Sequence, residues 1–530
     1  MKKKYLIAVL TAFFLCQSRA ENVVLYPQSP TAPPLYETRA IWLTTIGGID
    51  WPHTYANTPL AMSRQQQELC SILDLLCEAN INTVLLQTRI RATTIFPSDM
   101  EPWDGCLSGK PGQSPGYDAL AFAIDECHKR GMNIHAWVVT IPVGKWNAAG
   151  CKSLRKTYPN LLKKIGDEGF MNPEVNGTAD YLARFCEDLA QRYDIDGIHL
   201  DYIRYPDTWG KIANKDAARS NITRIVRTIS DRVKRHKPWI ELSCSPVGKY
   251  SDTKRQWSHG WNARNVVCQD AALWMKEGLM DAIYPMMYFK DENFYPFAID
   301  WQERSAGKTV APGLGIYFMH PREKNWALTD ITRELHVLRQ YGMGNCMFRS
   351  KFFTDNVKGI YDYYAETFAP YPAISSQSTE HSSQLSNLNP QTPKYHLFGS
   401  DTYPVDVTKA ENLLAIDLST PDVQHSKTEH IRYFAVTDAQ SGKTVREYGD
   451  EYNNLNDNLN SQLSTVNCQQ PDGSLIIIST IMGNDFTSAI VRDGAIKTDN
   501  LPAGHYKAYI INKRGYRHLL GTFSIEPNIP

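Results

Sequence analysis

The stretch Asp194–Asp207, "DIDGIHLDYIRYPD", begins like a buried strand and ends in a cluster of polar and aromatic residues. Its first half is rich in isoleucine and leucine and runs up to Asp201, and Arg204 and Tyr205 follow at once. Burying a carboxylate at the end of an apolar strand is costly unless the acid is paired or hydrogen-bonded. The stretch therefore predicts a strand that holds one acid at a defined place in the fold.

Short β-type runs alternate with amphipathic helical patterns over residues 37–369. In the helical stretches apolar residues recur at spacings of three and four, the period of a helix. The alternation predicts an α/β fold, a (β/α)8 TIM barrel, over this range. A doubly wound open sheet is the alternative, but the glycine-rich phosphate turn that would support it is missing. The predicted strands lie in 37–45, 81–89, 132–140, 195–203, 240–248, 280–289, 309–318 and 344–353, and the clearest helices in 63–79, 116–131, 177–193 and 331–342.

The two ends of the chain differ from this central part. Residues 1–20 have a cationic start, an apolar run and Ala20, which predicts a signal peptide cleaved before Glu21. The protein is therefore expected to be exported, either to the periplasm or out of the cell. The apolar run is too short for a transmembrane segment, and no later stretch qualifies. Cys16 makes a lipoprotein the alternative, which the bulky Leu15 disfavours.

Beyond the predicted barrel the composition changes twice. Residues 370–395 are rich in Ser, Gln, Asn and Pro without apolar periodicity, which predicts a linker or long surface loop. Residues 396–530 contain short alternating runs separated by turn residues, which predicts an all-β, immunoglobulin-like sandwich. The sequence thus indicates two folded domains after the signal peptide, as the length of 530 residues also favours.

The composition is that of a folded, charge-balanced protein. Charged residues make up 21% and the formal net charge is +0, so nothing points to nucleic acid as a partner. The cysteines are scattered through predicted strands and helices, and we expect them to be buried free thiols. Because no His/Cys cluster has the spacing of zinc ligands, neither a metal nor another cofactor is predicted.

The strand pattern predicts where the acid of the opening stretch lies. Barrel side chains alternate between the packed interior and the helix layer. Asp201 and His199 are predicted to point inward, whereas Ile198, Leu200 and Tyr202 are expected to face the helices. Asp201 then lies at the carboxyl end of the fourth strand, the rim at which TIM barrels build their active sites. A structural Asp–Arg pair that closes the barrel mouth is the competing interpretation.

Five separated segments resemble the bacterial glycosyl hydrolase-like 10 family: "ETRAIWLTTIGGIDWP", "FPSDMEPW", "GYDALAFAIDECHKRGMNIHAWV", "YDIDGIHLDYIRYP" and "GLGIY". They occur in the family's order, and the resemblance covers residues 37–364. It implies a TIM-barrel glycosidase, often exported and often followed by a β-domain, with bacterial cell-wall or related polysaccharides as the substrate class. The family's "DGIH-hydrophobic-D-Y" motif falls on Asp196–Tyr202, which supports Asp201 as the central acid.

A glycosidase normally needs a second carboxyl group across the scissile bond from the first. By analogy with retaining barrels, Asp201 is expected to be the nucleophile or charge stabiliser. Asp291 and Glu292, which follow the sixth strand, are the favoured proton donors, because two adjacent acids raise the pKa of one of them. Asp252, after the fifth strand, is the next candidate. Acids of the long loop 93–115 are further alternatives, and any of these acids would otherwise be an ordinary solvated loop residue.

Other residues are candidates for binding a sugar because of their place on predicted strands or loops. Each has a competing structural interpretation: the arginines could anchor the rim, and the histidines could be core residues. Trp103 is the favoured stacking platform, since a loop aromatic has less reason to pack. The predicted set is Arg89, Arg91, Trp103, His135, Trp137, His199, Arg204, Tyr205, Tyr288 and Tyr317.

Two other classes of protein remain open. The first is a non-catalytic glycan-binding protein on a degenerate TIM barrel, because no second acid is unambiguous. The second is a metal-dependent hydrolase that uses His199 and Asp201, for which the spacing suggests no third ligand. The sequence favours a glycoside hydrolase without a cofactor.

Overall fold

The computed structural model describes residues 36–375, 433–437, 444–449, 465–468, 470–480, 486–498, 501, 504–511 and 517–525. The predicted signal peptide lies outside the described residues, as does the predicted linker from residue 376 onward. Residues 370–375, the start of that linker, are bound to the barrel: Ile374 O accepts from the Glu37 N–H and Ala373 O accepts from Asn82 Nδ2, both at 2.9 Å.

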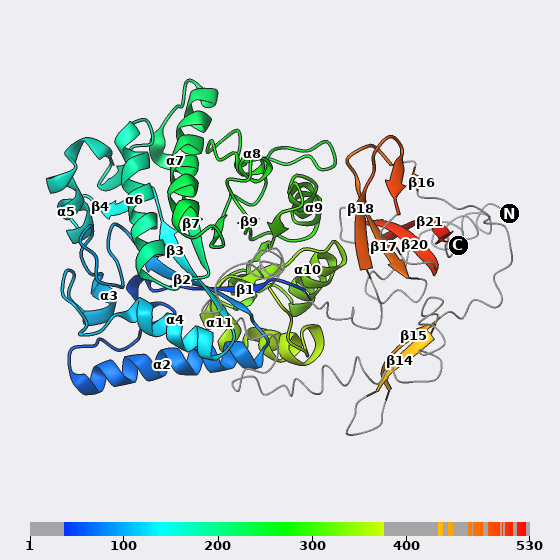
Figure 1. The fold of residues 1–530 in the computed structure, drawn as a ribbon, viewed down its shortest axis with the longest axis horizontal. Helices are drawn as coiled ribbons and strands as arrows, with labels where there is room; N and C mark the ends of the chain where they lie inside the picture. Colours follow the sequence, from blue (N-terminus) through cyan, green and yellow to red (C-terminus); the bar gives the residue numbers. More distant parts are fainter. Residues whose placement is uncertain are drawn as a thin grey trace, which may run out of the picture.

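The centre of the molecule is one sheet of parallel strands in the order β10-β12-β13-β1-β2-β3-β7-β8-β9-β11 (Figure 1). All eight predicted strand runs are confirmed, and two of them are each split into two short strands. The strands are β1 (Arg39–Leu43), β2 (Thr83–Arg89), β3 (Asn133–Val139), β7 (Gly197–Asp201), β8 (Glu241–Cys244), β9 (Ala282–Ile283), β10 (Met286–Met287), β11 (Thr309–Val310), β12 (Gly313–Leu314) and β13 (Asn345–Met347).

The two split runs connect the ends of this sheet. Pro285 separates β9 from β10 and Pro312 separates β11 from β12, and a proline has no N–H to give to a neighbouring strand. The pairing nevertheless continues through both interruptions: Gly313 N donates to Pro285 O at 2.7 Å and Cys346 N donates to Pro312 O at 3.0 Å. The arrangement is TIM-barrel-like, as predicted.

Helices follow most of the strands and cover the outside of the sheet (Figure 1). The four clearest helical patterns are confirmed as α2, α4, α6 and α10. Thr58 and Asp118 cap α2 and α4 by accepting hydrogen bonds from the first free backbone N–H groups. The helices are α2 (Pro59–Glu78), α3 (Gly105–Ser108), α4 (Ala119–Lys129), α5 (Ala149–Thr157), α6 (Asn176–Arg192), α7 (Lys215–His236), α8 (Ala271–Lys276), α9 (Tyr295–Glu303), α10 (Leu328–Gln340), α11 (Ser350–Thr354) and α12 (Ile360–Tyr363).

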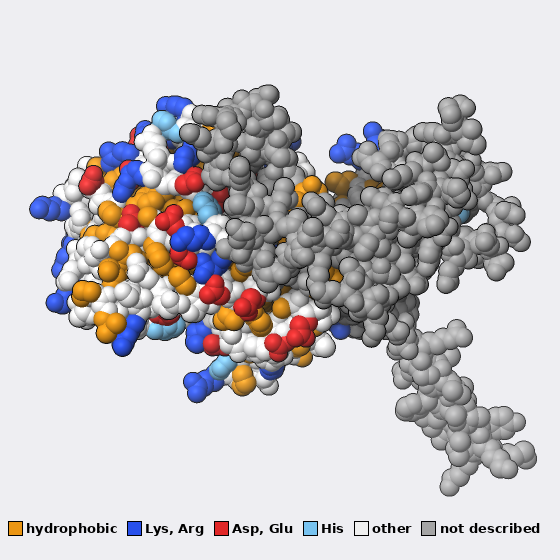
Figure 2. Space-filling model, turned by 60° about the horizontal axis from the view of Figure 1, so that its bottom comes forward, with side chains coloured by type: hydrophobic (Ala, Val, Ile, Leu, Met, Phe, Trp, Pro, Cys, Tyr) orange, Lys and Arg blue, Asp and Glu red, His pale blue; other side chains and the backbone are white. Residues whose placement is uncertain are grey.

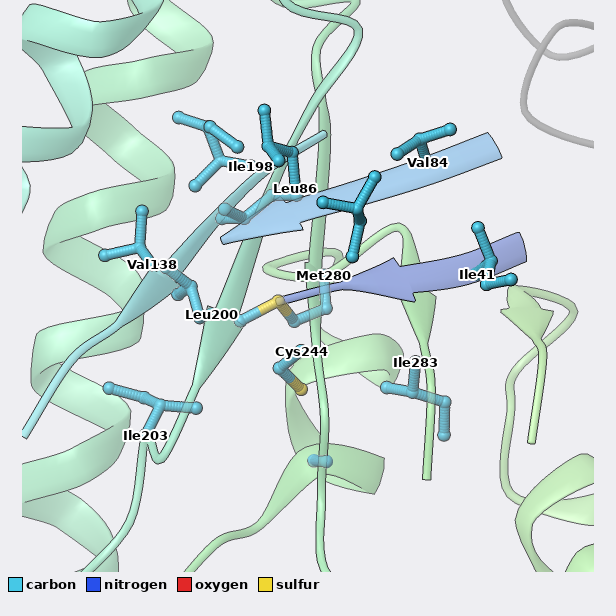
Figure 3. Packing of buried hydrophobic residues seen from close by; sticks show 14 of the residues in the cluster. Ile41, Val84, Leu86, Val138, Ile198, Leu200, Ile203, Cys244, Met280 and Ile283 are labelled. Carbon is cyan, nitrogen blue, oxygen red and sulfur yellow. The ribbon is translucent and has the colours of Figure 1, made fainter. Parts of the chain in front are cut away.

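Strand side chains divide between two apolar layers. On β2, Val84 and Leu86 belong to the outer layer between strands and helices, whereas Leu85 belongs to the inner cluster together with Trp42 and Trp137. Figure 3 shows part of the outer layer, with residues of β1, β2, β3, β7 and β8 in one continuous group. Each fully buried leucine contributes about 1.5–3 kcal/mol through removal of apolar surface from water. The inner cluster fills the space below the rim, so the ring of strands is packed and forms no pore.

The described C-terminal part is all-β, which confirms the coarse prediction for this region; the immunoglobulin-like sandwich stays a prediction. Four strands form an antiparallel sheet in the order β18-β17-β20-β21, and two antiparallel pairs form small sheets of their own. The strands are β14 (Tyr433–Thr437), β15 (Thr444–Gly449), β16 (Thr465–Asn467), β17 (Leu475–Thr480), β18 (Phe486–Ile490), β19 (Ala495–Lys497), β20 (Gly504–Ile511) and β21 (Arg517–Ile525). A further small sheet belongs to the barrel part of the chain and consists of β4 (Pro142–Lys145), β5 (Leu162–Ile165) and β6 (Glu168–Met171).

The distribution of charged side chains on the surface and the state of the cysteines agree with the expectations from the composition. On the face shown in Figure 2, basic and acidic side chains are interspersed over the described part of the molecule. The ten cysteines of the described residues are free, and eight of them are buried, so the prediction of buried thiols is confirmed for most of them. Within the described ranges, no helix has both the length and the apolar character required to cross a bilayer.

A buried ion-pair network joins the first strand to the last long helix. Glu37 accepts hydrogen bonds from Nε and Nη2 of Arg339 on α10 and from Nε of Arg39 on β1, all at 2.7 Å. Burial alone would raise the pKa of Glu37, but the two guanidinium groups hold it below its usual value. Removing one partner of such a network leaves buried charges without compensation.

We predict that Glu37→Ala lowers the free energy of unfolding by about 3–5 kcal/mol, because two buried arginines lose their common partner. Denaturant unfolding followed by tryptophan fluorescence measures this. The control is Asp355→Ala, which removes an exposed ion pair with Lys351 and should cost less than about 1 kcal/mol. Equal effects of the two substitutions would contradict the assignment of Glu37 to the structural network.

Candidate active site

Asp201 is the last residue of β7, at the carboxyl end of the parallel sheet. The predicted alternation along this strand is confirmed: Ile198 and Leu200 belong to the outer layer, and His199 and Asp201 contact the tryptophans of the inner cluster. Tyr202 departs from the prediction that its side chain faces the helices. It is 39% exposed and has a φ of 53°, so the chain leaves the strand through a left-handed residue instead of placing the Tyr202 ring against the helices.

Three donors hold the Asp201 carboxylate in one orientation. Oδ1 accepts hydrogen bonds from the Ser245 hydroxyl and from the Tyr202 backbone N–H, both at 2.8 Å. Oδ2 accepts one from the indole N–H of Trp137 at 3.2 Å. Because a carboxylate oxygen has two acceptor positions, Oδ1 is fully used and Oδ2 keeps one free. Oδ2 is therefore the atom available to a reacting group.

Burial raises the pKa of Asp201 above its ordinary value, since only 6% of the residue is exposed and its charged form is poorly solvated. The hydrogen bond from Ser245, the Tyr202 N–H and the positive charge of Arg204 work in the opposite direction and favour the ionised form. Asp201 therefore loses its proton at a higher pH than a surface aspartate does.

His199 lies one step below Asp201 on the inner face and is fully buried. Burial lowers its pKa well below the ordinary value, so the ring is neutral. The indole N–H of Trp42 can only donate, and it points at Nε2 at 3.3 Å. The ring proton is consequently on Nδ1, which donates to the Ser243 hydroxyl at 3.1 Å. Both ring nitrogens of His199 are therefore engaged within the barrel interior.

A cavity of about 430 Å³ opens next to Asp201 at the same rim. It lies beyond the carboxyl ends of β7, β8 and β10. Asp201 is next to two of the residues that line it. One is Tyr202, its neighbour in the chain. The other is Tyr288, whose pKa is raised by burial and further by the nearby Asp201 carboxylate. The lining residues are Tyr202, Arg204, Val247, Gly248, Lys249, Ser258, His259, Trp261, Met286, Tyr288, Phe289, Asn293 and Phe297.

Exposed aromatic side chains gather at this cavity. Trp261 is 44% exposed, and Phe289 and Tyr202 are exposed to a similar extent. Trp257, which is 76% exposed, contacts the ring of the lining residue His259 at a centroid distance of 3.8 Å. Large aromatic side chains at a surface lose apolar burial, so a group of them around one cavity indicates a binding surface.

Two buried cations face the same cavity. The Arg204 side chain is 3% exposed; its guanidinium lies 4.5 Å from the centroid of the Tyr202 ring and 5.3 Å from that of Trp261. Its Nη1 binds Asp207 at 2.9 Å, whereas its Nε has no hydrogen-bond partner among the described residues. Lys249 Nζ binds Asp252 and Ser258, each at 2.7 Å. The acidic partners of both cations are themselves exposed.

The predicted proton donors lie next to residues that line the cavity, but none of them is itself a lining residue. Asp291 and Glu292 form a short turn (Asp291–Asn293) after β10, and only the third residue, Asn293, lines the cavity. The Asp291 carboxylate is 3.9 Å from Nη1 of Arg333 on α10. Asp252 is tied to the cavity wall through Lys249 and through Ser258 at 3.4 Å. The structure thus gives Asp252 the more direct connection to the lining residues.

Two predicted binding residues, Arg89 on β2 and Trp103 in the loop that follows it, pack within the barrel and do not line the cavity. Arg89 is completely buried and binds both carboxylate oxygens of Glu101, at 2.7–2.9 Å. Tyr181 donates to the same carboxylate at 3.0 Å. Trp103, in the long loop after β2, packs half-buried against the outer core. None of the residues that line the described cavity comes from this loop.

The remaining predicted residues divide between rim and core. Arg91 is exposed at the rim. Burial and the Asp201 carboxylate raise the pKa of the Tyr202 hydroxyl, and the positive charge of Arg91 offsets a small part of that rise. His135 is fully buried with Nδ1 3.7 Å from Glu241, and Tyr205 is buried against Trp209. The ring centroids of Tyr288 and Tyr317 are 5.7 Å apart, and Tyr288 lines the cavity.

The structure therefore brings together Asp201, Trp137, Arg204 and Tyr288 from the predicted set. Sequence reasoning missed Ser245, Lys249 and the two exposed tryptophans of the loop after β8. The signal was present in "WSHGWNA", residues 257–263, which has two tryptophans and no apolar periodicity. Trp257 and Trp261 are loop aromatics, as Trp103 is, and both are exposed.

Comparison with known proteins identifies relatives for most of the chain. Glycosyl hydrolase YngK of Bacillus subtilis is 26% identical over 457 residues, which cover 79% of this chain and 86% of that protein. Glycosyl hydrolase DigH of Escherichia coli K12 is 28% identical over 329 residues, which cover 54% of this chain and 74% of that protein.

Solved structures show a more distant likeness. The glycoside hydrolase domain of PgaB from Bordetella bronchiseptica aligns with 12% identity and a TM-score of 0.42 over 63% of this chain and 99% of that one. Alpha-L-fucosidase isoenzyme 2 from Paenibacillus thiaminolyticus aligns with 13% identity and a TM-score of 0.42 over 62% and 49%.

The model of the family described as glycosyl hydrolase-like 10 matches residues 37–218 and 212–320. This range covers more than half of the 530 residues and includes β7, Asp201 and all the residues that line the cavity. The chain therefore belongs to the glycosyl hydrolase-like 10 family.

Proposed function

We propose that the protein is a glycoside hydrolase in which Asp201 acts on a glycosidic bond held in the adjoining cavity. The observation that carries the proposal is the fixed, buried carboxylate beside a cavity with exposed aromatic walls. Aromatic faces suit the apolar faces of sugar rings, and an oriented carboxylate is the group that glycoside hydrolysis requires. The glycosyl hydrolase names of both relatives agree with this class of reaction.

In this proposal Asp201 is the nucleophile or charge stabiliser. Trp137, Ser245 and the Tyr202 N–H hold its carboxylate and leave Oδ2 free to approach the anomeric carbon. A second carboxylic acid protonates the leaving oxygen as the bond breaks, and water later completes the hydrolysis. Asp252 joins Asp291 and Glu292 as a candidate for this proton donor because it is bound to two lining residues.

The charges of the cavity support a substrate class. Arg204 and Lys249 are buried cations whose acidic partners are exposed, and a guanidinium held between two rings is suited to a carboxylate. We propose that the substrate is a glycan with carboxylate-bearing sugars, which agrees with a bacterial cell-wall polysaccharide. Export to the periplasm or out of the cell, where such a substrate is found, forms part of the same proposal.

A non-catalytic glycan-binding protein is the second candidate, because the aromatic cavity would serve binding equally well. The two functions differ in what Asp201 does. Its burial and its three donors would have no purpose in binding alone, since a buried carboxylate costs stability. This difference makes Asp201 the residue to test.

We predict that Asp201→Asn lowers kcat for purified bacterial cell-wall glycan at least about a thousandfold, because the amide cannot replace the carboxylate in bond cleavage. Glycan binding, measured by calorimetry, should remain within about fivefold of the wild type. Release of reducing ends measures turnover. Unchanged turnover would remove Asp201 from the mechanism, and absent turnover in the wild type would favour the binding protein.

The same assay identifies the proton donor. Asp252→Asn, Asp291→Asn and Glu292→Gln are compared on the same glycan, and the donor is the residue whose loss lowers kcat by about a hundredfold or more. The other two serve as matched controls, because each also removes one negative charge near the cavity. Small effects of all three would contradict a proton donor from this group.

We predict that Ser245→Ala moves the acidic limb of the kcat/KM profile to higher pH by about 0.5–1 unit. The Ser245 hydroxyl stabilises the ionised form of Asp201, so its loss raises the pKa of that acid further. Activity that needs the carboxylate is then lost at a higher pH as the solution is acidified. Thr140→Val is the control, because the Thr140 hydroxyl donates to the backbone carbonyl of Asp201 and not to its carboxylate. A shift of the alkaline limb would instead make Asp201 the proton donor.

We predict that Arg204→Gln raises KM for a carboxylate-bearing glycan about tenfold or more, with little effect on the same glycan after its carboxylates are reduced to alcohols. The control variant is Arg91→Gln, which removes an exposed arginine of the same rim. An equal rise of KM for both glycans would contradict recognition of a carboxylate by Arg204.

A further inference from the structure

The loop of residues 248–262, here called the Trp261 loop, forms a large share of the cavity wall. Five of the thirteen lining residues belong to it: Gly248, Lys249, Ser258, His259 and Trp261. The loop follows β8 by three residues and contains no helix or strand. A long loop of this kind is ordered only if contacts along its length offset the loss of backbone entropy.

Helix α9 supplies these contacts along its whole length. Trp301 donates its indole N–H to the Gly248 carbonyl at 2.9 Å. Arg304, the residue that caps α9, places its guanidinium 4.8 Å from the centroid of the Tyr250 ring. The Lys249 ammonium lies 5.6 Å from the centroid of the Phe297 ring. The first part of the loop is therefore fixed to one face of this helix.

Glu303, the last residue of α9, holds a later part of the loop. Arg255 donates to its carboxylate at 2.8 Å. The side chain of Glu303 is only 11% exposed, whereas that of Arg255 is 42% exposed, so the carboxylate end of this ion pair is shielded from water. Arg255 lies two residues before Trp257, the most exposed aromatic residue at the cavity.

The same carboxylate also binds the C-terminal sheet. The backbone N–H of Leu475, the first residue of β17, donates to Glu303 Oε1 at 2.8 Å. Figure 1 shows β17 and β18 beside α9 and α10. Leu475 and Ile477 belong to the apolar core of the barrel, whereas the alternate residues Ile476 and Ile478 belong to the core of the C-terminal part. One face of β17 is thus packed on the barrel.

We propose that Glu303 is a positioning residue through which the C-terminal sheet orders the Trp261 loop. The sheet fixes Glu303 from one side and Glu303 fixes Arg255 from the other, so the C-terminal part contributes to the shape of the cavity without entering it. The consequence for glycan affinity rests on the proposed function of that cavity, whereas the ordering of the loop does not.

The test is hydrogen exchange in the full-length protein. Glu303→Ala should speed exchange of the backbone amides of residues 249–262, and also of Leu475, at least about fivefold. Arg255→Gln should speed exchange in the loop and leave the Leu475 amide unchanged. Ile477→Ala, which loosens the packed face of β17 and lies outside the loop, should also speed exchange in the loop.

Tyr341→Phe is the matched control. It removes another hydrogen bond between the two parts, from the Ile511 N–H to the Tyr341 hydroxyl at 3.0 Å, and should leave exchange in the Trp261 loop unchanged. Unaltered loop exchange in Glu303→Ala, or equal acceleration in Tyr341→Phe, would overturn the proposal.

Glycan kinetics separate this inference from the function on which it draws. Glu303→Ala should raise KM for cell-wall glycan about fivefold with kcat nearly unchanged, because a disordered loop must be fixed on binding. Faster loop exchange without any change in KM would uphold the positioning role of Glu303 and contradict the cavity as the glycan site.

Discussion

The site depends on one carboxylate, that of Asp201, which is buried from water and yet held in a fixed orientation at the carboxyl end of the strands. Desolvation of Asp201 opposes its charge, and the donors Trp137, Ser245 and the Tyr202 N–H restore part of what water would provide. The balance raises the pKa of the acid and leaves one oxygen position free. Because each donor comes from a different part of the chain, this arrangement exists only when β3, β7 and the start of the loop after β8 are in register.

The surroundings of Asp201 are divided by charge. Below it, the inner cluster contains Trp42 and the neutral His199, whose hydrogen bonds are satisfied within the barrel. Above it, Arg204 brings positive charge to the cavity wall beside the exposed rings of Tyr202 and Trp261, and Lys249 does so beside the buried ring of Phe297. The packed interior fixes the position of Asp201, and the loops supply most of the cavity wall. This division is the usual one in barrels of parallel strands, whose rim loops vary over a constant core.

Much of the fold could be predicted because barrel strands are buried on both faces and form short apolar runs; all seven residues of β2 are buried. The inward direction of Asp201 followed from the same alternation. The left-handed backbone of Tyr202 could not be predicted, because a hydrophobic pattern does not encode φ. The pairing of Arg89 with Glu101 depends on how a long loop folds back, and Trp261 lies in a stretch without periodicity. Those features arise from tertiary contacts, which one sequence does not reveal.

The most direct measurement is a crystal structure of the Asp201→Asn protein soaked with an oligosaccharide from bacterial cell-wall glycan. We predict sugar rings in the cavity between Tyr202 and Trp261, with an anomeric carbon about 3–3.5 Å from the side chain of residue 201. A ligand carboxylate should face Arg204. An oligosaccharide bound elsewhere on the protein, or one whose glycosidic bonds all lie beyond the reach of residue 201, would contradict it.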